Sequence, residues 1–132
     1  MRYSHQRELI LREVLSRSDY PTAEQICTSL RAVCPRLSLG TVYRDLNTLV
    51  DIGKVRRVSI PGEADCFEGP QEDHQQLYCR SCQKVKSIHI SDAKLKALID
   101  ACPDIVPEDY SLTVFGLCDE CAAKAAKETE KL

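Results

Sequence analysis

Apolar residues recur at helical spacing in three segments of the first half of the chain. The stripe within residues 5–17 predicts a first helix, because its members share one helical face. Thr22 and Gln25 have the spacing of a capping box, which predicts the start of a second helix. Ser38 is the N-cap residue expected for a third helix, and Gly53 lies where that helix would end. The stripes consist of Leu9, Ile10, Val14, Leu15, Ile26, Leu30, Val42, Leu46, Leu49 and Val50.

Two short strand-like segments follow the third predicted helix. Residues 54–60 and 64–68 are expected to pair as a hairpin, with Pro61 and Gly62 in the turn between them. Three helices followed by a hairpin describe a winged helix, whose third helix enters a groove of DNA. A small helical bundle with a hairpin and no nucleic-acid role has the same pattern of elements.

A polar segment with a Gly-Pro break separates the two halves of the chain. It predicts a first domain over residues 1–69, a hinge over 70–76 and a second domain over 77–132. Helices and strands are mixed in this plan, so the predicted fold class is α+β. The second domain is expected to contain strands at 77–79, 85–90 and 110–117, a helix capped by Ser91 or Asp92 with Leu95, Leu98 and Ile99 facing inward, and a helical tail from Ala122.

Charge is distributed unevenly along the chain. Residues 1–60 contain ten basic and six acidic residues, a net charge of +4, whereas the remaining residues carry −6. A basic front half is typical of a surface that meets a polyanion such as DNA. An ordinary solvated surface can carry the same charges, so this pattern supports the winged helix without requiring it.

The cysteine content and the lack of long apolar runs indicate a compartment and a chemistry. No apolar run in the chain is long enough to span a bilayer or to form the core of a signal peptide, so we expect a cytoplasmic protein without a membrane partner. Eight cysteines in a reducing compartment favour metal or thiol chemistry over a framework of disulfides.

Four of the cysteines form two Cys-x-x-Cys pairs, Cys79 with Cys82 and Cys118 with Cys121. Each pair can bind a metal from one side, and two pairs complete a tetrahedron. Four thiolates leave no open coordination position, so the pattern predicts one structural zinc per chain and no catalytic metal. Two disulfides and a tetrathiolate iron centre are the alternatives with the same residues.

A second, regulatory metal site is a further hypothesis. Cys66 and Glu68 share one face of a predicted strand, His74 lies in the hinge and His89 follows the first cysteine pair. These four side chains together could bind a metal between the two halves. The alternative is that they are unrelated surface groups. Cys27 and Cys102 are expected to behave as small buried apolar side chains, whereas Cys34, in a Cys-Pro loop, could be exposed.

The motifs resemble the ferric-uptake-regulator family over nearly the whole chain. The matching stretches are Arg7–Leu15, Pro35–Leu46 with its Thr-Val-Tyr-Arg sequence, Asp73-His74 leading into Cys79–Cys82, and Phe115–Cys121. Within that family, the short chain and the tetrathiolate site are most similar to the peroxide-sensing branch. The resemblance implies a winged-helix DNA-binding domain, a C-terminal α/β dimerisation domain, and metal-dependent repression of transcription by a homodimer.

The chain departs from the family pattern where the regulatory metal would bind. Arg36 stands at a position that is usually histidine, Gln76 replaces the second histidine of a His-x-His pair, and Ser87 stands where an acidic residue is expected. Glu68 and His74 match the pattern. The second metal expected for a regulator of this family is Fe, Mn or Zn. Because of these departures, a zinc-sensing or metal-independent variant is the alternative.

Together these observations predict a regulator that binds a double-stranded DNA operator, with no enzyme activity and no small-molecule substrate. The third helix would enter the major groove and the hairpin would contact the DNA backbone. The alternative functions of a different class are a thiol redox switch and a protein-interaction module that is held together by zinc and does not bind DNA. The residues expected to contact DNA are Ser38, Thr41, Tyr43, Arg44, Arg56 and Arg57.

Overall fold

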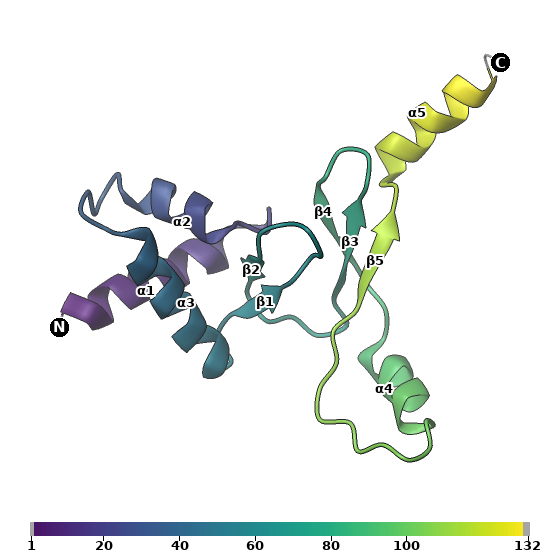
Figure 1. The fold of residues 1–132 in the computed structure, drawn as a ribbon, viewed down its shortest axis with the longest axis horizontal. Helices are drawn as coiled ribbons and strands as arrows, with labels where there is room; N and C mark the ends of the chain where they lie inside the picture. Colours follow the sequence, from purple (N-terminus) through teal and green to yellow (C-terminus); the bar gives the residue numbers. More distant parts are fainter. Residues whose placement is uncertain (1, 131–132) are drawn as a thin grey trace. The chain divides into compact units, whose positions relative to one another are not determined.

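The structure, a computed structural model, describes residues 2–130 and the side chains of residues 5–128. The chain divides into two compact units, Met1–Pro70 and Gln71–Leu132. Helices and strands occur in both units, which confirms the predicted α+β class (Figure 1). Within residues 2–130, none of the helices combines the length and apolar character that crossing a membrane requires.

The first unit begins with three helices, α1 (Arg2–Ser16), α2 (Ala23–Leu30) and α3 (Leu39–Asp51). The capping box predicted for α2 is present, because the Thr22 side chain accepts a bond from the Gln25 backbone and the Gln25 side chain accepts one from the Thr22 backbone. Ser38 caps α3 as predicted. The chain leaves α3 through Gly53, whose φ of +78° is a conformation that glycine adopts without strain.

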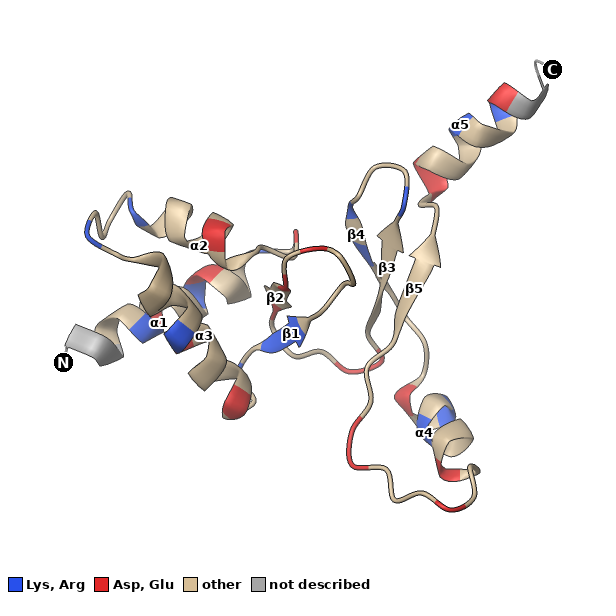
Figure 2. Ribbon diagram, in the orientation of Figure 1, with Lys and Arg blue, Asp and Glu red and all other residues tan. Residues whose placement is uncertain are grey.

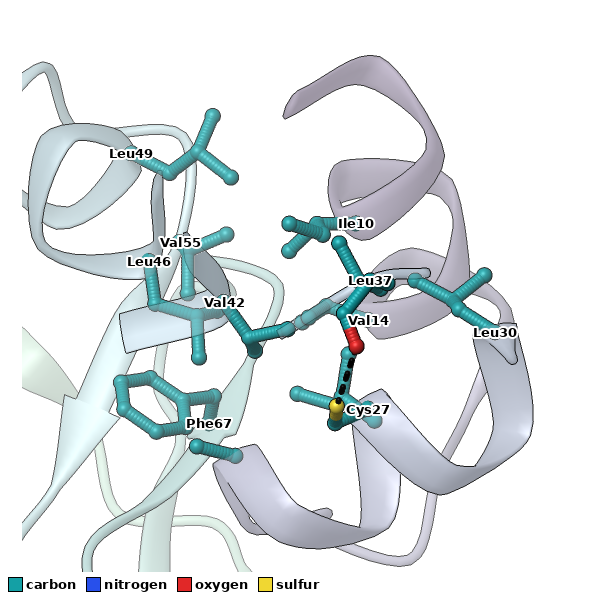
Figure 3. Packing of buried hydrophobic residues seen from close by; sticks show 12 residues of the cluster. Ile10, Val14, Cys27, Leu30, Leu37, Val42, Leu46, Leu49, Val55 and Phe67 are labelled. Carbon is teal, nitrogen blue, oxygen red and sulfur yellow. Dashed lines mark hydrogen bonds between the residues drawn. The ribbon is translucent and has the colours of Figure 1, made fainter. Parts of the chain in front are cut away.

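The three helices enclose one apolar core, which Figure 3 shows from close by. Val42, Leu46 and Leu49 of α3 are at most 2% exposed, so one complete face of this helix is buried. Inside the core, the thiol of Cys27 donates to the Leu37 carbonyl over 3.7 Å. Burying a face of this kind stabilises a helix more than its intrinsic propensity does.

A two-stranded antiparallel hairpin completes the first unit. Strand β1 (Arg56–Val58) pairs with β2 (Cys66–Glu68), in a register that sets Arg56 opposite Glu68. Phe67 points into the helical core and is 1% exposed, so the hairpin is anchored to the helices.

The second unit is built on a three-stranded sheet with the order β4-β3-β5. Strand β3 (Gln75–Cys79) lies in the middle, antiparallel to β4 (Val85–Ile88) and parallel to β5 (Thr113–Gly116). The parallel pairing joins segments more than thirty residues apart in sequence, with Cys79 opposite Gly116.

Strand β3 begins inside the range predicted as the hinge. Gln75 and Gln76 are 2% and 1% exposed, although a polar segment was expected to be a linker. The Gln75 side chain accepts a bond from the Ile90 backbone and donates to the Ile90 carbonyl. The Gln76 amide donates to the Leu112 carbonyl over 3.0 Å and to the Thr113 hydroxyl over 3.1 Å. These bonds pair both polar atoms of the Gln75 amide and the amide nitrogen of Gln76, whereas the buried amide oxygen of Gln76 has no hydrogen-bond partner within the described chain.

The second unit also contains two helices, α4 (Asp92–Asp100) and α5 (Asp119–Glu130). Ser91 caps α4, as one of the two predicted candidates. The expectation that Leu98 faces inward is wrong, because this side chain is 70% exposed and α4 buries no residue within the described chain. Periodicity indicates which face of a helix is apolar, but not whether a neighbouring element covers that face.

Candidate metal centre and nucleic-acid interface

The parallel pairing of β3 with β5 brings the two Cys-x-x-Cys pairs together. Cys79 ends β3, and Cys118 follows β5 by two residues. The Arg80 backbone donates to the Gly116 carbonyl over 2.8 Å, so the parallel ladder continues into the first cysteine turn. Cys121 lies in the first turn of α5, where the Ala122 backbone donates to the Cys118 carbonyl. The second pair therefore stands at the junction of a strand and a helix.

The four sulfur atoms form a cluster of the right size for one tetrahedral metal. All four Sγ atoms lie within 4.8 Å of one another, and the Sγ atoms of Cys82 and Cys118 are 3.9 Å apart. A tetrahedron with zinc–sulfur bonds of about 2.3 Å has edges of about 3.8 Å. Cys79 and Cys118 are buried, and no disulfide joins the cysteines. The residues present therefore fit a closed structural metal site.

Within this cluster, backbone amides favour the thiolate form of Cys79. The amides of Cys82, Cys118 and Ser81 donate toward Cys79 and lower the pKa of its thiol to about 6, from an ordinary value of 9.0. Hydrogen bonds to the charged form favour that form. Thiolate is the form that binds metals, so the surroundings of Cys79 favour its role as a metal ligand. At Cys121 the Ser81 side chain lowers the pKa, but neighbouring thiols outweigh this effect and raise the pKa to about 11.

The outward face of α3 carries the polar residues predicted to contact DNA. Tyr43 is 42% exposed and Arg44 is also exposed, on the side opposite the buried Val42 and Leu46. At the start of the helix, the Ser38 side chain accepts from the Thr41 amide and donates to the Thr41 hydroxyl over 2.9 Å. Ser38 and Thr41 are thereby ordered at the helix N-terminus.

The hairpin of β1 and β2, here called the wing, carries two arginines that other side chains of the first unit hold in place. Arg56 forms an ion pair of 3.1 Å with Glu68, which is 6% exposed. Arg57 donates to the Asn47 side chain of α3 and lies 3.6 Å from the Asp65 carboxylate. The wing is therefore tied to α3 by a polar contact as well as by the apolar core.

Asp45 is a buried charge that the sequence reasoning did not single out. It is 0% exposed and lies on the inner side of α3, within ion-pair distance of Arg7 of α1 and of Arg44. Asp45 lies three residues after Val42 and four residues before Leu49. This spacing places it on the buried stripe of α3, and its burial could have been predicted from that position.

The four residues of the hypothetical regulatory site are divided between the two units. Cys66 is buried in the first unit, where its thiol donates to the Val58 carbonyl over 3.6 Å. Burial, followed by the charges of Glu68 and Asp65, raises the pKa of Cys66 to about 11. In the second unit, the rings of His74 and His89 lie 5.5 Å apart. A site that joins the four residues stays a prediction.

The entry of the chain into β3 is fixed by a reciprocal pair of hydrogen bonds. The Asp73 amide donates to Asp92 over 2.8 Å, and the Asp92 amide donates to Asp73 over 2.6 Å. Asp73 has a φ of +51°, which a non-glycine residue adopts only where its surroundings hold it. The Asp92 carboxylate also accepts from the Tyr110 hydroxyl. The N-terminus of α4 thus anchors the segment that precedes the sheet.

Comparison with known proteins agrees with this geometry. A model of the ferric uptake regulator family matches residues 1–113. The peroxide-responsive repressor PerR of Staphylococcus epidermidis is 26% identical over 122 residues, which cover 92% of this chain and 81% of that protein. The Campylobacter jejuni peroxide stress regulator is 26% identical, with a TM-score of 0.74 over 91% of each chain. The Vibrio cholerae ferric uptake regulator is 30% identical, with a TM-score of 0.62 over 85% of this chain and 88% of that one. The chain belongs to the ferric uptake regulator family.

Proposed function

We propose that this regulator binds double-stranded DNA as a homodimer and represses the genes beside its operator. The observation that carries the proposal is α3, a capped helix with one face in the core and with Tyr43 and Arg44 exposed on the other. A helix of this kind can enter the major groove while its buried face fixes its orientation. The Vibrio cholerae relative has DNA-binding domains, which supports the same role for this chain.

Zinc in the four-cysteine cluster would support DNA binding indirectly. The metal would connect β3 to the start of α5 and hold the second unit in its folded form. That unit exposes many apolar side chains, which supports its role as the dimerisation surface. The exposed residues are Leu98, Ile105, Val106, Tyr110, Val114, Phe115 and Leu117.

We infer a response to peroxide or to metal supply as the regulatory signal. Two relatives that are 26% identical, the peroxide-responsive repressor and the peroxide stress regulator, support the peroxide-responsive type. The hypothetical regulatory metal at Cys66, Glu68, His74 and His89 would favour the form of the dimer that binds both half-sites.

A metal-independent regulator is the second candidate, and Gln76 favours it. This glutamine stands where the family pattern has the second histidine, and its amide is already bonded to Leu112 and Thr113. Elemental analysis of the purified native protein separates the two candidates. One zinc per chain and no other metal supports metal-independent regulation, whereas a second bound metal supports sensing and identifies the ion.

The DNA-binding proposal is tested with the Arg44→Ala variant. An operator is first isolated by selecting duplexes from a random pool with the zinc-loaded protein. We expect Arg44→Ala to weaken binding to that operator at fixed salt, while the melting temperature changes little because Arg44 is exposed. Arg12→Ala is the matched control, since Arg12 is an exposed arginine whose side chain pairs with Glu8 on α1. Failure of the wild-type protein to enrich any duplex would refute the proposal.

A further inference from the structure

Two arginines from different helices face a single buried carboxylate in the first unit. The Nε atom of Arg7 on α1 lies 3.6 Å from Oδ1 of Asp45, and the Nε atom of Arg44 on α3 lies 3.7 Å from the same oxygen. Asp45 is 0% exposed, and within the described part of the chain neither of its carboxylate oxygens has a hydrogen-bond partner. Among the ion pairs of the described first unit, the partners of Asp45 are therefore the guanidinium groups of Arg7 and Arg44.

The arrangement differs from an ion pair that only stabilises the fold. A buried carboxylate without hydrogen bonds needs compensating charge, and one guanidinium is enough to neutralise it. Here two guanidinium groups face it, so the formal charge of these three side chains together is +1. The side chains of Arg7 and Arg44 are 38% and 52% exposed, so this positive charge is accessible to solvent on both helices.

Guanidinium groups held in this way are suited to bind phosphate. Arginine presents a planar set of donors, so one edge can face Asp45 while other donors point toward an anion. Figure 2 shows basic positions on both α1 and α3 of the first unit. Arg44 belongs to the helix proposed to enter the groove, and the shared carboxylate keeps Arg7 close to it.

We propose that Arg7 contacts a DNA phosphate and that Asp45 is the positioning residue that holds Arg7 and Arg44 side by side. The DNA interface would then extend from α3 and the wing onto α1. This inference rests on the proposed function, and it adds a contact that the residues predicted from the sequence do not include.

The test measures how the affinity of the zinc-loaded full-length protein depends on salt. The slope of log K against log salt is negative, and its magnitude is here called the salt slope or simply the slope. Each lost phosphate contact lowers this magnitude by about 0.9. A dimer carries two copies of Arg7, so we expect Arg7→Gln to lower the slope by about 1.8 on the selected operator and equally on a non-operator duplex of the same length. Arg12→Gln removes the same charge from the exposed side of α1 and is expected to leave the slope unchanged.

A double variant shows whether the effect of Arg7→Gln on the slope comes from the lost contact or from a change in net charge or folding. Arg7→Gln with Asp45→Asn removes one positive and one negative charge together, so the net charge of the chain is unchanged and no buried carboxylate loses its partner. We expect this variant to fold, as judged by its melting curve, and to keep the reduced slope. A folded double variant with the wild-type slope would overturn the inference, as would equal slopes for Arg7→Gln and Arg12→Gln.

The role of Asp45 is tested by Asp45→Asn alone. Both arginines remain, so the salt slope is expected to stay at its wild-type value, while the affinity ratio of operator to non-operator DNA falls because Arg44 loses its fixed position. An unchanged ratio would contradict the positioning role. If Arg44→Ala weakens binding while Arg7→Gln does not, the inference fails and the proposed function stands. If the wild-type protein binds no DNA, the proposed function fails first.

Discussion

The ion pair between Arg56 and Glu68 allows the contribution of the wing to stability to be predicted in some detail. The pair joins opposite positions of β1 and β2 at 3.1 Å. The Glu68 side chain is 8% exposed and the Arg56 side chain is 26% exposed. The change that tests it is Arg56→Met, which keeps an unbranched apolar side chain in place and removes the charge.

The expected magnitude follows from this burial. Removing one partner of a fully buried pair costs about 3–5 kcal/mol, and the partial exposure of Arg56 reduces this to about 2 kcal/mol. A unit of seventy residues has a free energy of unfolding of about 4–10 kcal/mol, so the loss is a large share of the total. For a domain of this size, about 2 kcal/mol corresponds to a fall in Tm of roughly 8–16 °C.

A double-mutant cycle on urea unfolding measures the pair itself. Glu68→Gln is close to Glu68 in shape and removes the charge that Arg56 compensates. We expect the double variant to be less destabilised than the sum of the two single variants, with a coupling energy of at least about 1 kcal/mol. If Arg56→Met costs less than about 0.5 kcal/mol, or if the two effects are additive, the pair does not stabilise the wing and the reasoning is wrong.

Two further predictions concern the thiols. Because the pKa of Cys66 is about 11 when folded and 9.0 is the ordinary value, the folded protein keeps a proton that the unfolded chain loses above pH 9, so stability should fall as pH rises from 9 to 11. Cys66→Ala should show a smaller loss over that window in urea melts, and identical pH profiles would contradict this. Chelation of zinc, or Cys118→Ser, is expected to abolish the dimer in sedimentation experiments, since the cluster connects β5 and α5 to β3. A folded, monodisperse dimer without metal would refute that role.

Local signals in the sequence predicted most of the first unit. The capping box at Thr22 and Gln25, the cap at Ser38 and the buried face of α3 depend on residues a few positions apart, and the structure confirms each of them. The fold class follows from local patterns of the same kind. The convergence of the four cysteines was predicted because two short pairs of fixed spacing are sufficient to indicate a metal site. The domain boundaries and the DNA contacts stay predictions.

Contacts between distant segments were not predictable from the pattern. Gln75 and Gln76 are polar and were assigned to a hinge, yet their amides bond to residues up to 37 positions away and are buried. Asp45 was not singled out, because the pattern within one helix does not show that Arg7 of another helix compensates its buried charge. Leu98 was placed inside because its helix is amphipathic, but no element of the described chain covers it.

The parallel pairing of β3 and β5 has a consequence for the order in which the molecule forms during synthesis. The contacts of the first unit are mostly between neighbouring helices, so this unit can assemble soon after its last strand leaves the ribosome. In the second unit β3 can pair with β4 earlier, but the sheet is complete only after Thr113–Gly116 has been made, and the metal cluster only after Cys121. We therefore expect nascent chains to acquire the helical unit first. Translation that stops before β5 would release a folded helical unit joined to a segment that cannot complete its sheet or its metal cluster.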